Sequence, residues 1–228
     1  MMSKKIYSVA VDGPSGAGKS TLSKAVAGEL GILYVDTGAI YRTIGYYVFE
    51  KGIDPKDAPA VNAILPELDI QMRYGDDGLQ RMYLNGQDVT TQIRLPQISM
   101  YASAVSAIPE VREFLLEMQR ELARRSSVIM DGRDIGTVVL PDADVKIFLT
   151  AEAEVRAQRR AKELAERGTP TPFEEVLRDI QQRDCNDSHR AAAPLRQAED
   201  AVLVDTSNLT FAESQQKLTE IIKGRVGL

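Results

Sequence analysis

One eight-residue stretch constrains this chain more than any other: "GPSGAGKS", from Gly13 to Ser20. It follows the apolar run Ile6–Val11 and precedes a helical pattern of apolar residues that ends at Leu30. Every fixed position of G-x-x-x-x-G-K-[ST] is filled. The glycines let the backbone wrap around phosphate oxygens, and the following helix points its positive end at the same anion. The stretch therefore predicts a strand, a phosphate-binding loop and a helix, in that order.

This loop also predicts which residues hold a nucleoside triphosphate. Lys19 is expected to reach the β- and γ-phosphates, and Ser20 to hold Mg²⁺. The residues expected to contact the phosphates of ATP are Gly13, Pro14, Ser15, Gly16, Ala17, Gly18, Lys19, Ser20 and Thr21.

Five short apolar runs predict the core of the fold. They are rich in β-branched residues, and continuous apolar strands are typical of a parallel sheet that is covered on both faces. Helical patterns alternate with them, which indicates an α/β protein. We predict a P-loop NTPase fold, three-layer α/β/α, with a five-stranded parallel sheet whose strands lie at about 6–11, 32–35, 127–131, 145–149 and 201–205.

Two segments interrupt this alternation. Residues 68–89 contain a GDDG turn and an Asn85-Gly86 turn between alternating runs, which predicts a three-stranded antiparallel meander. Residues 151–190 predict two charged helices: Gly168 closes the first, and Thr171, Pro172 and Glu174 are read as a capping box that opens the second. We expect one domain over 1–228, with an antiparallel insert at about 63–100 and a helical lid with its returning helix at 151–190.

Composition excludes several classes of protein. The 228 residues carry a net charge of −5, which argues against a general binder of nucleic acid polymers. The single cysteine forms no internal disulfide, and no apolar run approaches membrane-spanning length. We therefore predict a cytoplasmic protein that binds small molecules, and expect a monomer because nothing in the site requires a partner.

The basic residues indicate a second anion site. Arginine supplies 18 of the 28, and arginine suits bidentate recognition of phosphate. Transfer of a phosphoryl group between two phosphates needs fixed cations to offset their repulsion. Arginines stand at the predicted strand ends and in the helical excursion, namely Arg42, Arg133, Arg156, Arg159, Arg160, Arg167, Arg183 and Arg190.

The phosphate loop leaves two classes of function open. A guanine-specific switch usually has N-K-x-D, and the nearest string here, "NGQD" at Asn85–Asp88, lacks the lysine and lies in the predicted hairpin. The alternative is a kinase for a small acceptor, which the second anion site favours. The acceptor is open at this point between nucleoside monophosphates, such as UMP or AMP, and a non-nucleotide such as shikimate.

Several motifs together resemble bacterial cytidylate kinases, a family of P-loop nucleoside monophosphate kinases. They are Gly13–Ser20, "DTGAIYR" at Asp36–Arg42, "PEVRE", "DGRDIGTVV" from Asp131, and "RDCNDSHRAAAPL" from Arg183. The resemblance spans nearly the whole chain in matching order. It implies transfer of the γ-phosphoryl group of ATP to CMP or dCMP with Mg²⁺, a mobile lid, and a monophosphate-binding region at 37–125.

The resemblance also implies roles for individual residues. Lys19, Arg133 and Arg160 are the implied catalytic residues, and Arg156 and Arg160 the implied phosphate contacts of the lid. The implied CMP site comprises Arg42, Arg133 and Arg190 on the phosphate, Arg183 and Asp187 near the sugar, Ser103, Arg112 and Asp134 on the base, and Thr37, Tyr41, Asp131 and Gly132 lining the same site.

Cys185 and His189 are the rarest residues of the chain and stand four apart. One cysteine and one histidine are too few soft ligands for zinc, and a nucleophilic pair needs a third orienting group. We interpret both as bystanders in a segment whose working residues are Arg183, Asp187 and Arg190.

Overall fold

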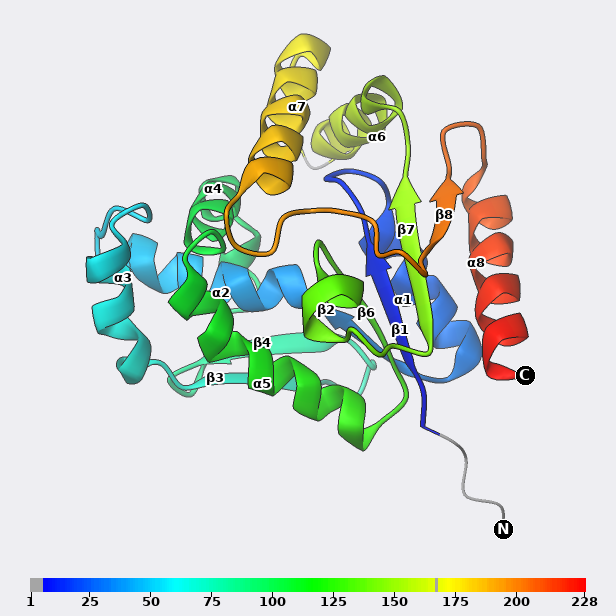
Figure 1. The fold of residues 1–228 in the computed structure, drawn as a ribbon. Helices are drawn as coiled ribbons and strands as arrows, with labels where there is room; N and C mark the ends of the chain where they lie inside the picture. The colour runs from blue at the N-terminus through cyan, green and yellow to red at the C-terminus, as the bar shows by residue number, and fades with distance from the viewer. Residues whose placement is uncertain (1–5, 167) are drawn as a thin grey trace. The chain divides into compact units, whose positions relative to one another are not determined.

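The computed structural model describes residues 6–166 and 168–228. The chain falls into two compact units: unit 1 comprises Met1–Tyr34 and Leu122–Leu228, and unit 2 comprises Val35–Glu121. Figure 1 labels the helices and strands.

The parallel sheet of the fold has five strands, as predicted, in the order β2-β6-β1-β7-β8. β1 pairs in parallel with β6 and β7, and β7 with β8. Val9 and Val11 are fully buried, which explains why this strand is apolar without alternation. The strands are β1 (Ser8–Asp12), β2 (Leu33–Asp36), β6 (Val128–Gly132), β7 (Val145–Thr150) and β8 (Val202–Asp205).

Helices of unit 1 supply the rest of its core. Leu22 and Val26 of α1 and Leu218 and Ile222 of α8 share one buried cluster with strand residues such as Val9. Figure 1 shows α1 behind β1 and β7, and α8 beside β8. The helical elements of this unit are α1 (Lys19–Leu30), the π-helical turn η3 (Ile135–Val139), α6 (Ala153–Glu166), α7 (Phe173–His189) and α8 (Phe211–Val226).

Unit 2 contains the predicted antiparallel meander, in the strand order β3-β4-β5. The GDDG turn closes with a hydrogen bond from the Gly78 N–H to the Gly75 carbonyl, and the Asn85-Gly86 turn has positive φ at both residues. The unit comprises α2 (Thr37–Glu50), α3 (Ala58–Ile64), the 3-10 turn η1 (Leu65–Glu67), β3 (Ile70–Tyr74), β4 (Gln80–Leu84), β5 (Gln87–Asp88), the 3-10 turn η2 (Gln92–Arg94), α4 (Pro96–Val105) and α5 (Pro109–Arg125).

The predicted capping box of the second charged helix is wrong. α7 begins at Phe173, after Pro172 in an extended conformation, so Thr171 lies outside the helix and its hydroxyl donates to the Thr169 carbonyl instead. A true capping box opens α8, between Thr210 and Glu213. Among the described residues, no helix is long and apolar enough to cross a membrane.

Candidate functional site

The phosphate loop joins β1 to α1 through three glycines with positive φ. Gly13, Gly16 and Gly18 have φ of 149°, 74° and 86°, a region that favours glycine. Gly18 precedes α1 without any side chain that caps the helix, and the first turn of α1 holds no acidic residue. The start of α1 thus keeps the positive end that an anion requires.

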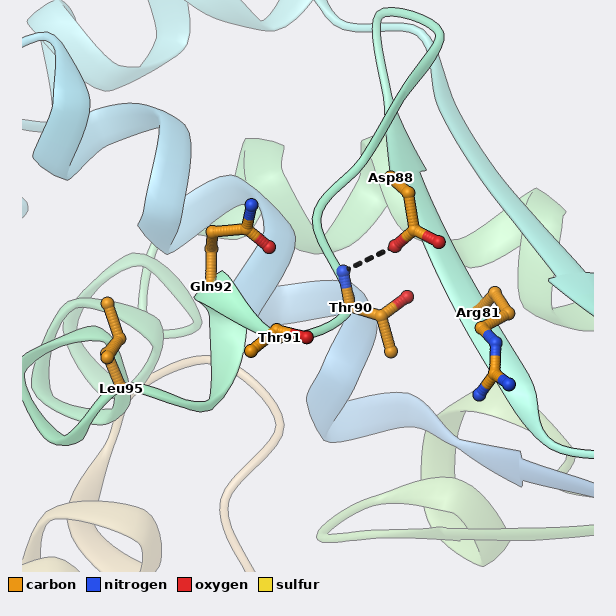
Figure 2. A pocket seen from close by; sticks show the side chains of 6 residues that line it. All are labelled: Arg81, Asp88, Thr90, Thr91, Gln92 and Leu95. Carbon is orange, nitrogen blue, oxygen red and sulfur yellow. Dashed lines mark hydrogen bonds between the residues drawn. The ribbon is translucent and has the colours of Figure 1, made fainter.

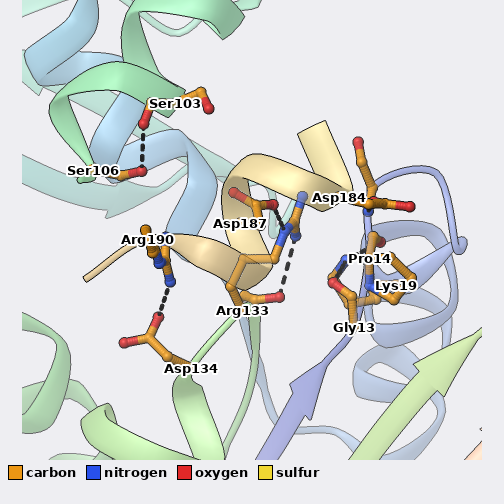
Figure 3. A network of polar contacts seen from close by, with 12 residues as sticks. Gly13, Pro14, Lys19, Ser103, Ser106, Arg133, Asp134, Asp184, Asp187 and Arg190 are labelled. Carbon is orange, nitrogen blue, oxygen red and sulfur yellow. Dashed lines mark hydrogen bonds and ion pairs between the residues drawn. The ribbon is translucent and has the colours of Figure 1, made fainter. Parts of the chain in front are cut away.

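Lys19 is buried inside this loop, with 5% of its surface exposed. Its Nζ donates to the carbonyls of Gly13 and Pro14, both at 2.8 Å, as Figure 3 shows. Burial, followed by the charge of Arg133, lowers the pKa of Lys19 well below its ordinary value, although Asp131, Asp12 and Asp187 oppose this. A phosphate anion beside the ammonium would shift this pKa upward again, because opposite charges favour the charged form.

Ser20, which follows Lys19 in the sequence, contacts Asp131 at the end of β6. The Ser20 hydroxyl donates to Asp131 Oδ2 at 2.7 Å, and the Tyr34 hydroxyl donates to Oδ1 at 2.9 Å. No cluster of three or more metal-ligating side chains exists in the described part of the chain. A hydroxyl and a carboxylate nevertheless fit Mg²⁺, which takes few protein oxygens and fills its other positions with water and phosphate.

Arg133 and Asp187 form a short ion pair near the loop. Arg133 Nε lies 2.6 Å from Asp187 Oδ2, so β6 and α7 are joined here. Arg190 Nη2 lies 3.4 Å from Asp134 Oδ1, and its Nε donates to the Ala193 carbonyl at 2.6 Å. The structure therefore brings four of the predicted acceptor-site residues together in unit 1.

Arg183 lies among other positive charges. Burial, followed by Arg160, lowers its pKa, and Arg133 acts in the same direction. Such mutual repulsion is relieved when a polyanion binds between the guanidinium groups. This cluster has the electrostatics expected of a phosphate site.

The two predicted lid arginines, Arg156 and Arg160, differ in their contacts. Arg156 is buried, and its Nη1 binds the Ser15 carbonyl at 2.8 Å and Asp184 Oδ2 at 2.7 Å. Arg160 pairs with Glu163 on its own helix at 2.7 Å. Arg156 thus contacts the phosphate loop itself, whereas Arg160 is partly exposed beside Arg183. Arg167 lies outside the described residues.

Unit 2 brings together the other predicted residues. Asp36 caps α2, and Arg42 Nη2 pairs with its Oδ2 at 2.8 Å, while Thr37 is buried. The Arg112 guanidinium lies 5.4 Å from the Tyr41 ring centroid and donates to the Ser106 carbonyl at 3.1 Å. The Ser106 hydroxyl donates to the carbonyl of Ser103 at 2.9 Å.

An open groove of about 510 Å³ also lies on unit 2 (Figure 2). None of the predicted site residues lines it. Its lining residues are Arg81, Asp88, Thr90, Thr91, Gln92 and Leu95.

Comparison with known proteins decides the family. The family model described as "Cytidylate kinase" matches residues 9–224. The chain belongs to the cytidylate kinase family. Proteins named cytidylate kinase from Caldicellulosiruptor bescii and Caldicellulosiruptor saccharolyticus are 52% and 51% identical, over 96% and 98% of both chains. A crystal structure of an uncharacterized protein from Eubacterium ventriosum shares the fold, with a TM-score of 0.53, 10% identity, and coverage of 95% of this chain and 98% of the other.

The contacts of two acidic residues of this cytidylate kinase family member, Asp184 and Asp12, were not predicted from the sequence, although Asp12 stands at the end of a predicted strand. Asp184 binds both Arg156 and the Ser15 N–H, so it fixes the phosphate loop. Its position three residues before Asp187 places both acids on one helix face, a signal that the sequence does contain. Asp12 ends β1 and accepts the Ile135 and Gly136 N–H groups, both at 2.7 Å. No local pattern reveals that contact, because it spans more than 120 residues.

Cys185 and His189 contact each other at the exposed surface of α7. The Cys185 Sγ lies 3.7 Å from His189 Nδ1, and both side chains are exposed. His189 Nδ1 is also 2.9 Å from the Cys185 carbonyl oxygen within the same helical turn.

Asp12→Asn tests the buried carboxylate that holds the turn after β6. Burial is the main reason that the pKa of Asp12 rises from 3.8 to about 6, against the two N–H groups that lower it. Between these pH values the folded chain holds the proton more tightly than the unfolded chain. The group therefore adds stability below about pH 4 that is lost as the pH rises to 6, about 3 kcal/mol at most.

Urea unfolding between pH 4 and 7 measures this effect. We expect the unfolding free energy of the parent protein minus that of Asp12→Asn to fall across that range and then level off. A constant difference would contradict the assignment.

Proposed function

We propose that this protein transfers the γ-phosphoryl group of ATP to CMP or dCMP, giving ADP and CDP or dCDP. The observation that carries this proposal is the extent of the family match, which runs through both units and includes the phosphate loop, Arg42 and Arg133. The burial of Lys19 within the loop supports the same conclusion.

The proposed donor site is the phosphate loop with the helices that follow β7. Residues 13–21 hold the phosphates of ATP, and Lys19 reaches the β- and γ-phosphates. Arg160 contacts transferring phosphate from the proposed lid, residues 151–190. The contacts of Arg156 with Ser15 and Asp184 favour a role in holding the loop in shape.

The residues proposed to bind the acceptor are those that the family resemblance implies. Arg42, Arg133 and Arg190 bind the phosphate of CMP, Arg183 and Asp187 lie near the sugar, and Thr37, Tyr41 and Gly132 line the site. Ser103, Arg112 and Asp134 read the base. Cytosine offers an amino donor beside two acceptors, so a carboxylate can accept while arginine and serine donate. Uracil reverses part of that pattern and would leave buried groups unpaired.

The reaction proposed for this site needs no general base. The phosphate of CMP is largely dianionic near neutral pH, so one of its oxygens attacks the γ-phosphorus directly and ADP leaves on the opposite side. Lys19 and the arginines stabilise the charge that spreads over the transferring oxygens and hold the two phosphates in line.

Ser20 and Asp131 are the residues proposed to hold Mg²⁺. Their oxygens are 2.7 Å apart and match the hard donors that the ion prefers. When bound, Mg²⁺ would neutralise part of the phosphate charge. The family resemblance implies that Asp131 also lines the CMP site, and its contact with Ser20 supports the role on the metal side.

The substrates are small nucleotides, and we propose a monomer in the cytoplasm that binds neither nucleic acid polymers nor membranes. The lone cysteine fits a reducing compartment.

A panel of acceptors tests the proposed activity. ADP release would be measured with CMP, dCMP, UMP, AMP and shikimate, each with ATP and Mg²⁺. We expect strong turnover with CMP and dCMP and weak turnover with UMP. Strong turnover with another acceptor instead, or binding of nucleotide with only slow hydrolysis, would overturn the proposal.

A further inference from the structure

Two guanidinium groups converge on one oxygen in unit 2. Arg42 Nη2 lies 2.8 Å and Arg94 Nη2 3.2 Å from Asp36 Oδ2. Burial, which raises the pKa of Asp36, is outweighed by the two arginines, and this pKa lies below its ordinary value. The carboxylate is therefore ionised, and the three groups together carry one net positive charge.

The antiparallel insert fixes the backbone of the same residue. The Asp36 N–H donates to Gln80 Oε1 at 2.8 Å, and Gln80 Nε2 donates to the Asp36 carbonyl at 3.2 Å. Gln80 begins β4 and pairs in register with Tyr74. The position of the Gln80 amide is thus set by the meander, and the meander in turn holds Asp36, the N-cap of the helix that carries Arg42.

Arg42 keeps one donor ready for a ligand. Its Nε is buried without a hydrogen-bond partner among the described residues. A buried donor without a partner destabilises the protein until an acceptor binds it. Gly38 leaves room for the guanidinium, since a Cβ there would lie 3.1 Å from Arg42 Nη1.

We propose that Gln80 and Arg94 are positioning residues that act through Asp36 on Arg42 and so set the affinity for the acceptor's phosphate. The inference rests on the proposed function, in which Arg42 binds the phosphate of CMP. Gln80 fixes the place of the Asp36 carboxylate. Arg94 shares that carboxylate, so Arg42 retains charge for the phosphate. Without Arg94, Asp36 would pair with Arg42 alone and cancel its charge.

The test measures CMP affinity by calorimetric titration without ATP, together with steady-state kinetics. Arg94→Gln and Gln80→Leu are expected to raise the Kd and the KM for CMP about tenfold while the KM for ATP stays unchanged and kcat changes little. Arg94→Lys should restore part of the affinity, since it keeps the charge. Arg81→Gln and Gln71→Leu, which alter exposed contacts of the same insert, are the matched controls and should behave like the parent protein.

A double-mutant cycle separates positioning from direct binding. If Arg94 acts through Asp36, Arg94→Gln should raise the Kd for CMP less than about twofold in a protein that already carries Asp36→Asn. If the fold-changes in Kd of Arg94→Gln and Asp36→Asn multiply in full in the double variant, the inference is overturned. Equal losses of affinity for CMP and ATP would also overturn it, because a merely structural role would cause them. The parent protein is titrated and assayed first. Absence of CMP binding and turnover there would overturn the proposed function itself, independently of any variant.

Discussion

Lys19→Met is expected to lower kcat for ATP-dependent phosphorylation of CMP by about 10²–10³-fold or more, because a fixed charge at the transferring phosphate is lost. The fold should survive. Burial lowers the pKa of Lys19, which means that the charged form is disfavoured in the free protein. A neutral side chain of similar length removes this cost, but it also takes away the donor that the Gly13 and Pro14 carbonyls accept from. The two effects oppose each other, so the melting temperature should change little.

Two measurements separate the effect of Lys19→Met on the reaction from its effect on stability. Single-turnover kinetics with saturating ATP and CMP measure the rate of phosphoryl transfer, and thermal unfolding measures the melting temperature. Lys24→Met is the matched control, because Lys24 lies on the same helix and is exposed. A Lys19→Met protein that retains more than about a tenth of the parent kcat would contradict the electrostatic role assigned here.

The parts of the fold with local signals could be predicted from the sequence. The phosphate loop is specified by glycines at fixed spacing, and the meander by two turns with glycine at the required positions. The failed capping box shows the limit of such signals. Thr171 and Glu174 have the right spacing, but Pro172 shifts the start of α7 by one residue. A local pattern allows a cap; the path of the chain decides whether it forms.

The contacts that support the candidate site could not be predicted in this way. Asp12 holds the turn after β6, and Gln80 holds Asp36 across 44 residues of sequence. Both are single polar residues whose partners are backbone groups, and backbone groups leave no mark in a sequence. The position of the arginines at the strand ends could be predicted because these residues follow apolar runs. Which carboxylate each one meets depends on packing between elements.

Gly13→Ala is expected to have the largest effect on structure of any substitution in the phosphate loop. A Cβ at this position would lie 1.9 Å from the Leu149 carbonyl oxygen and 3.0 Å from its carbon. These are backbone atoms of β7, a central strand, so no side-chain movement can relieve the clash. The φ of 149° adds strain for any residue with a Cβ. The loop must therefore leave its place against the sheet.

Gly28→Ala is the matched control for this change. Gly28 lies within α1, and a Cβ there meets nothing within 4 Å. Alanine in a helix interior stabilises by up to about 1 kcal/mol relative to glycine, so this variant should melt at or above the parent temperature. Thermal unfolding with and without ATP and Mg²⁺ reports both effects, since a ligand that binds only the folded state raises the melting temperature. Gly13→Ala should melt far below the parent and gain nothing from ATP. If it melts like the parent and is stabilised by ATP to the same extent, the close approach of the loop to β7 does not hold the nucleotide site together.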